Sequence, residues 1–135
     1  MTLVLGAGAC ADQTKVKECN ALVEVINNGV EKIQKVATVA PDGGTPVSEL
    51  RAMADTMDVL AGDCAKVELS IAELQKYSGD YQAMAKEVAA AARDLAKAVD
   101  KVDMEQMSKA QAQMEEAVKR EDPVVEGINK LCRNP

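Results

Sequence analysis

Apolar residues recur every three or four positions along the middle of the chain. They form an unbroken stripe from Leu50 to Leu74, and the same phase resumes at Tyr81 and continues to Val102. This spacing predicts amphipathic helices that bury one face. The stripe consists of Leu50, Met53, Met57, Leu60, Cys64, Val67, Ile71, Leu74, Tyr81, Ala85, Val88, Ala92, Leu95, Val99 and Val102. We expect the other helices to cover it.

A helical segment precedes this stripe, at residues 13–37. Its own apolar stripe consists of Cys19, Val23, Ile26, Val30, Ile33 and Ala37. A loop rich in Pro and Gly follows at residues 41–46. Thr45 is suited to cap the next helix and Pro46 to occupy its first position.

Another helical segment follows the stripe. Asp103 and Gln106 form a capping-box pattern that opens this helix, and Met107, Ala110 and Met114 lie on its apolar side. Pro123 is expected to break or kink it, because proline lacks the backbone N–H that the helix uses. A short apolar segment over residues 124–132 then ends the chain.

These segments predict an all-α fold, an antiparallel up-down four-helix bundle whose last helix is kinked at Pro123. The second helix would end near Tyr77 and the third begin at Tyr81, with Ser78-Gly79-Asp80 as the turn. The alternative is one long central helix over residues 46–102, covered by two antiparallel helices. Because each half of that form would be only two helices thick and would bury little, we favour the bundle.

Composition narrows the possible chemistry. The chain has no Phe, no Trp, no His and two Tyr, so Leu, Val, Ile, Met and Ala must fill the core. Without His, the commonest general base and metal ligand is missing. No nucleophile elbow, phosphate-binding loop or calcium loop occurs. We therefore expect a protein that is not an enzyme, with no catalytic residues, no cofactor and no metal.

The net charge of −6 is spread evenly over the two halves of the chain. No basic patch favours nucleic acid as a partner, and no polybasic run favours an anionic membrane surface. Asp55, Asp58 and Asp63 fall outside the apolar stripe, where we expect solvated charges. The expected partner is a protein whose identity the sequence does not define.

The first residues resemble the end of a bacterial export signal. Leu3 to Leu5 would be a remnant of its apolar region, and Ala7-Gly8-Ala9 fits a cleavage box of small residues. Cys10 stands directly after this box, where a lipoprotein carries its lipid, so we expect lipidation at Cys10 and membrane contact only through that anchor. The chain then divides into a signal remnant at residues 1–12 and a bundle domain at residues 13–135.

Two other interpretations of residues 1–12 remain. Gly6, Gly8 and Ala11 fit a dinucleotide-binding fingerprint, but that motif needs a strand–helix–strand unit, and only helices follow it. A disordered tail is the second interpretation.

The four cysteines are Cys10, Cys19, Cys64 and Cys132, and no two are spaced as in a zinc motif. In an up-down bundle the start of the first helix and the end of the last lie at the same end, so Cys19–Cys132 is the favoured disulfide. Cys19–Cys64 is the second choice, and Cys64 alone could be a small buried apolar residue. A disulfide implies an oxidising compartment, periplasmic or outer-membrane-anchored, in agreement with export.

The remaining features fit packing or binding. The methionines are typical of adaptable core filler, although thioethers can also hold Cu(I). Tyr77 and Tyr81 could pack at a helix end or form the rim of a ligand site. We expect a non-enzymatic extracytoplasmic bundle that acts by protein binding or scaffolding. The alternative is a carrier or sensor for a small apolar ligand, which a large apolar pocket near the two tyrosines would support.

Three stretches resemble the small uncharacterised helical lipoproteins of myxobacterial-type bacteria. They are Cys10 behind its small-residue box, the run Glu18-Cys19-Asn20-Ala21-Leu22-Val23-Glu24-Val25-Ile26-Asn27, and the ending Glu121-Asp122-Pro123 with Ile128-Asn129-Lys130-Leu131-Cys132. The resemblance spans nearly the whole chain. It implies an exported helical domain and transfers no activity.

Overall fold

The computed structural model describes the backbone of residues 2–38 and 46–133 and the side chains of residues 13–36 and 47–133. Every described element of regular structure is a helix. The helices are α1 (Thr2–Thr38), α2 (Pro46–Lys66), α3 (Ala72–Lys101), α4 (Met104–Lys119) and α5 (Glu121–Arg133). None of the described helices has the apolar length that a bilayer crossing requires.

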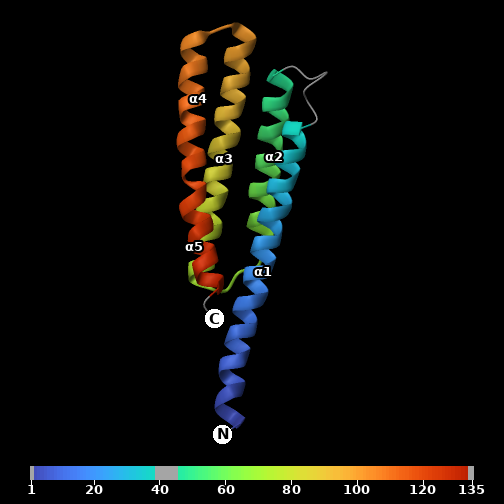
Figure 1. Ribbon diagram of the computed structural model, residues 1–135, viewed down its shortest axis with the longest axis vertical. Coiled ribbons are helices and arrows are strands. Elements are labelled where there is room, and N and C mark those ends of the chain that lie inside the picture. Colours follow the sequence, from blue (N-terminus) through green and yellow to red (C-terminus); the bar gives the residue numbers. More distant parts are fainter. Residues whose placement is uncertain (1, 39–45, 134–135) are drawn as a thin grey trace.

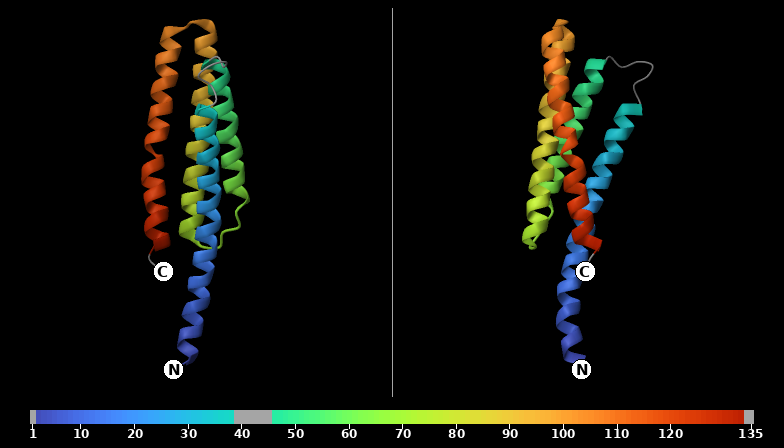
Figure 2. Two further views of the ribbon diagram at one scale, coloured as in Figure 1. Left: turned by 45° about the vertical axis from the view of Figure 1, so that its right-hand side comes forward. Right: turned by 60° about the vertical axis from the view of Figure 1, so that its left-hand side comes forward.

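The predicted up-down four-helix bundle is confirmed, with α4 and α5 forming a broken fourth helix (Figure 1). α3 lies at the centre and packs against α2, α4 and α5, while α1 packs against α2 and α5. Within the described part, α4 contacts only α3 and α5. The first turns of α1 extend beyond one end of the bundle, and the α3–α4 hairpin projects beyond the other (Figures 1 and 2).

The first helix begins earlier than the sequence predicts. α1 starts at Thr2 rather than near Gln13, so the helical backbone continues through the stretch assigned to a signal remnant or a tail. The interpretation as a strand of a dinucleotide fold is therefore wrong. The side chain of Cys10 lies outside the described residues, and lipidation there stays a prediction.

The predicted turn at Ser78-Gly79-Asp80 is wrong, and so is the continuous central helix. The chain leaves α2 after Lys66 and enters α3 at Ala72, so Ser78-Gly79-Asp80 lies inside α3. In the connection, Val67, Leu69 and Ile71 are half-buried against the core, while Glu68 and Ser70 are exposed. An alternation of period two is typical of extended backbone, which this segment adopts.

A carboxylate from α1 fixes this connection. Glu18 Oε1 accepts hydrogen bonds from the backbone N–H of Ser70 at 2.9 Å and from its hydroxyl at 2.5 Å. Glu18 Oε2 accepts from the Ile71 N–H at 3.2 Å. These donors precede the first turn of α3, where N–H groups have no partner within the helix. The Ser70 hydroxyl bond is the largest cause that lowers the pKa of Glu18, against the opposing effect of burial.

The last helix breaks at Arg120, three residues before the predicted kink at Pro123. The displacement follows from proline geometry. Its ring clashes with the carbonyl four residues earlier, which here belongs to Lys119, the final residue of α4. Pro123 itself lies in the first turn of α5, where its missing N–H costs nothing.

The favoured disulfide is present in the structure. Cys19 on α1 and Cys132 on α5 are bonded, with their Cα atoms 5.8 Å apart. Cys64 is a free, buried thiol, as expected for a small core residue, and burial raises its pKa to about 11. Closing a loop of this length contributes about 4–5 kcal/mol in the chain-entropy account.

Glycine lets α1 and α2 approach closely. A Cβ at Gly29 would lie 2.3 Å from Leu60 Cδ1 and 2.8 Å from its Cγ, and Leu60 is only 2 % exposed. A Cβ at Gly79 on α3 would meet no atom within 4 Å. These two positions give opposite expectations for the same substitution.

We expect Gly29→Ala to lower the free energy of unfolding by about 1–2 kcal/mol, because the overpacked Leu60 must shift within the core. Gly79→Ala should raise it by about 0.5–1 kcal/mol, because alanine is the better helix former. Urea denaturation followed by helical circular dichroism measures both. Equal effects at the two positions would contradict a close α1–α2 contact at Gly29.

We expect Glu18→Gln to lower stability by about 1–3 kcal/mol at pH 7, because it removes a charged acceptor shared by several donors. The folded-state pKa of Glu18 lies below its ordinary value of 4.5. Its contribution is therefore complete above that value and is lost as the pH falls through the folded-state pKa. The difference between wild type and variant should shrink accordingly on acidification. Glu24→Gln, at an exposed position on the same helix, is the control and should change little at either pH.

Candidate interaction surface

The connection between α3 and α4 is a tight turn at Val102 and Asp103. The Asp103 N–H donates to the Ala98 carbonyl at 2.9 Å and the Val102 N–H to the Val99 carbonyl at 3.1 Å. This is the Schellman arrangement that ends many helices. The Asp103 side chain then accepts from the Gln106 N–H at 3.1 Å, which confirms Asp103 as the cap of the next helix.

Val102 adopts a backbone conformation that valine strongly disfavours. Its φ of 53° and ψ of 39° are left-handed, and among the described residues it alone has a positive φ without being glycine. Such a conformation costs a β-branched residue about 1–2 kcal/mol. Val102 is also 77 % exposed, and Met104 beside it is 70 % exposed. We call residues 102–104 the hairpin tip.

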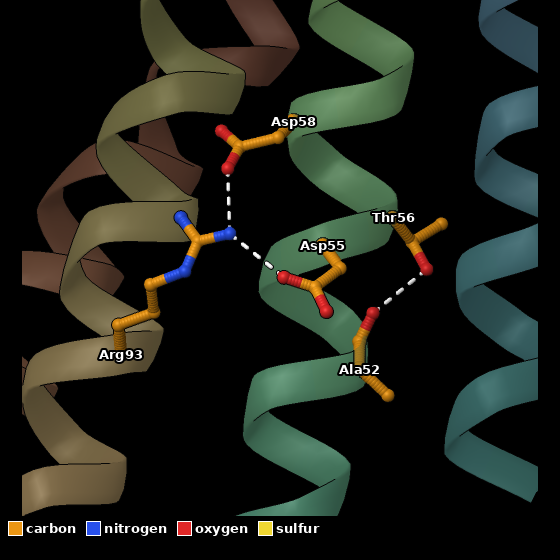
Figure 3. A network of polar contacts seen from close by, with 5 residues as sticks. All are labelled: Ala52, Asp55, Thr56, Asp58 and Arg93. Carbon is orange, nitrogen blue, oxygen red and sulfur yellow. Dashed lines mark hydrogen bonds and ion pairs between the residues drawn. The ribbon is translucent and has the colours of Figure 1, made fainter.

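Ion pairs join α3, the helix that leads to the hairpin tip, to α2. Arg51 pairs with Asp100 in the last turn of α3 at 2.9 Å. Arg93 bridges Asp55 at 2.9 Å and Asp58 at 2.6 Å (Figure 3). The hydrogen bond to Asp55 is the main cause that raises the pKa of Arg93. Of the three aspartates expected to be solvated, these two have a partner on α3, and Asp63 pairs with Lys66 on its own helix.

Alanines form the contact between α3 and α4. Ala91 and Ala98 on α3 and Ala110 and Ala117 on α4 are all buried. Each pair is separated by a heptad, so it lies on one side of its helix. Two hollows run along the outer edge of this contact, one lined by Ala98 and Ala110 and the other by Ala91 and Ala117.

Charged side chains rim these two hollows. We call this surface the outer face of the hairpin. Its polar residues are Glu87, Asp94, Lys97, Lys101, Asp103, Gln106, Lys109, Gln113, Glu116 and Arg120. These residues belong to two separate helices, and the pairing of α3 with α4 brings them together.

The two tyrosines hold α5 in place. Tyr81 is 1 % exposed, and its hydroxyl lies 3.4 Å from Glu121 Oε1. Burial is the main cause that raises its pKa. A Cβ at Gly127 would lie 2.5 Å from Tyr77 Cε1, so the ring packs directly over that glycine. Both side chains therefore pack against α5 from within α3, so the expected packing at a helix end is wrong in its position.

The methionines with described side chains differ in their exposure. Met57 and Met84 are buried, Met53, Met107 and Met114 are half-buried, and Met104 is exposed. The described residues contain no group of three or more Cys, Asp or Glu side chains placed to hold a metal ion.

Sequence reasoning missed the hairpin tip and the role of Glu18. Val102 looked like the last position of the apolar stripe, although a valine directly before a helix cap occupies the position that glycine usually takes. Nothing near Glu18 in the sequence indicates its bond to Ser70, since 52 positions separate them.

Searches against protein-family models, curated proteins and solved structures find no match to this chain.

We expect Val102→Gly to be more stable than Val102→Ala by about 1 kcal/mol. Glycine adopts the left-handed conformation without strain, whereas alanine keeps the clash of its Cβ. Both variants remove the exposed valine side chain, so their difference isolates the backbone strain. Thermal unfolding of the two variants measures it, and equal midpoints would contradict a strained tip.

Proposed function

We propose that this protein is a non-enzymatic helical bundle that works outside the cytoplasm and binds another protein through its hairpin tip. The observation that carries the proposal is the pair of exposed apolar side chains, Val102 and Met104, on a strained turn. Glycine at position 102 would serve the turn better and would expose no apolar surface. Strain and exposed apolar groups together favour a contact site.

The tip is also presented rigidly. The ion pairs of Arg51 with Asp100 and of Arg93 with Asp55 and Asp58 hold α3 against α2. A surface that is already ordered loses less conformational entropy when it binds. The projection of the α3–α4 hairpin beyond α1 and α2 leaves the tip accessible (Figure 2).

The disulfide supports the extracytoplasmic part of the proposal. Disulfides such as Cys19–Cys132 persist in oxidising compartments and are rare in the cytosol. A lipid on Cys10 would anchor the N-terminal end of α1, and the tip lies at the opposite end of the molecule (Figure 1). An anchored molecule would thus present its tip away from the membrane.

The alternative function, a carrier for a small apolar ligand, has less support. Such a carrier needs space between the helices near the tyrosines. Tyr81 is enclosed by the core, and Tyr77 packs over Gly127. The binding proposal requires no internal space.

A photo-crosslinking amino acid placed at Met104 tests the proposal in the producing cells. We expect position 104 to yield a discrete cross-linked product, and Val59, which is 54 % exposed on α2, to yield none. The captured protein, once purified, should bind the Val102→Ser/Met104→Ser variant at least about tenfold more weakly than wild type, because the apolar contact is lost. If positions 104 and 59 gave the same cross-linked products, or neither gave any, the result would contradict a role for the tip.

The same cells report on the compartment. After acid quenching and alkylation, Cys19 and Cys132 should be protected because they form the disulfide. A cytoplasmic protein with both thiols modified would refute the extracytoplasmic location and leave the binding proposal standing.

A further inference from the structure

Most charges on the outer face of the hairpin are sorted by sign along its length, with Asp103 and Arg120 as the exceptions. Lys101 and Lys109 lie toward the tip, and Glu87 and Glu116 lie toward the far end. Asp94 and Gln113 line both hollows and mark the middle. The face therefore has a basic half and an acidic half, although the chain as a whole carries a net charge of −6.

The lysines of the basic half have no acidic partner within the described chain. Lys97, Lys101 and Lys109 form no ion pair there, in contrast to the lysines at positions 66, 76 and 130. Of the other charges of the face, Asp94 and Glu116 also form no ion pair among the described residues, whereas the rest have partners. Asp103 caps α4, and Arg120 pairs with Glu87.

The spacing of these charges is symmetric about the middle. Lys101 lies seven positions after Asp94, and Glu87 lies seven positions before it. On α4, Lys109 lies four positions before Gln113, and Glu116 lies three positions after it. Consider a two-fold axis that lies in the plane of the face, perpendicular to the helices, at the height of Asp94 and Gln113. It would place α3 opposite α3 of the second copy and α4 opposite α4, with each pair antiparallel.

We propose that two copies of this chain associate antiparallel through the outer face of the hairpin. Lys101 then faces Glu87 of the partner subunit, and Lys109 faces Glu116 of the partner subunit. Such isologous contacts are the commonest in homo-oligomers. Asp94 lies near the axis, and the partner's Lys97, one helical turn away, offsets the repulsion between the two Asp94 carboxylates.

The lining of the two hollows and the dimensions of the outer face are consistent with a reversible association. Buried alanines line the floor of the two hollows, so the long polar side chains of the rim would make the contact with the partner. The face from Glu87 to Lys101 is roughly 20 Å long at the rise of an α-helix and two helices wide. That is at the low end of the size range of specific interfaces, so we expect a concentration-dependent dimer. The two tips would point to opposite ends, which makes the dimer bivalent. This inference does not depend on the proposed function of the tip.

Sedimentation equilibrium of the purified, oxidised full chain tests the proposal. Wild type should associate reversibly, and added salt should weaken the association because salt screens the ion pairs. Lys101→Glu/Lys109→Glu and Glu87→Lys/Glu116→Lys should each weaken self-association at least about tenfold by facing like charges. An equimolar mixture of the two variants should associate again, since all four contacts then join opposite charges. Native mass spectrometry identifies the expected heterodimer.

Lys66→Glu/Lys130→Glu changes the net charge as much as the lysine variant does, at positions away from the outer face. It should dimerise like wild type. The proposal fails if wild type stays monomeric at roughly 1 mM and low salt, a concentration at which even an association with a millimolar dissociation constant forms dimers. It also fails if the charge-reversed variants dimerise like wild type, or if their mixture does not associate. Helical circular dichroism must show each variant folded.

Discussion

The buried carboxylate of Glu18 is the interaction on which the arrangement of helices depends. A carboxylate away from water is costly unless hydrogen bonds satisfy it. Here Ser70 and Ile71 supply them, and no buried side-chain nitrogen or oxygen atom in the described residues lacks a partner. The next residue, Cys19, bonds to Cys132. Two consecutive residues of α1 thus fix both the start of α3 and the end of α5.

This non-local contact explains which parts of the fold could be predicted from the sequence. The helical class follows from local spacing, and the Cys19–Cys132 pair follows from the up-down topology. The α2–α3 turn could not be located, because Val67 and Ile71 fit a helical stripe as well as an alternating extended segment. What selects the extended form is a carboxylate 52 positions earlier in the chain. The break at Arg120, by contrast, follows from proline geometry alone, because the clash falls four residues before Pro123.

The hairpin tip could not be predicted from the sequence for a different reason. Periodicity indicates which side of a helix is apolar, but it does not indicate how far the neighbouring helix extends. Tyr81 and Val102 belong to the same stripe, yet Tyr81 is 1 % exposed and Val102 is 77 % exposed. The difference arises because α3 and α4 project beyond α1 and α2 (Figure 1). Only the lengths of the neighbouring helices decide which part of a stripe becomes core.

Stability and exposure therefore lie at opposite ends of the molecule. The disulfide, the Glu18 contacts and both tyrosines lie toward the end where α5 meets α1, whereas alanine contacts and surface ion pairs hold the projecting hairpin. Surface ion pairs contribute about 0–1 kcal/mol each. They therefore offset little of the free-energy cost of the left-handed conformation at Val102. The left-handed Val102 persists because the Schellman bonds on one side and the Asp103 cap on the other both require that turn. The strain is thus held by local hydrogen bonds, and the hairpin tip keeps its shape without contact from the rest of the core.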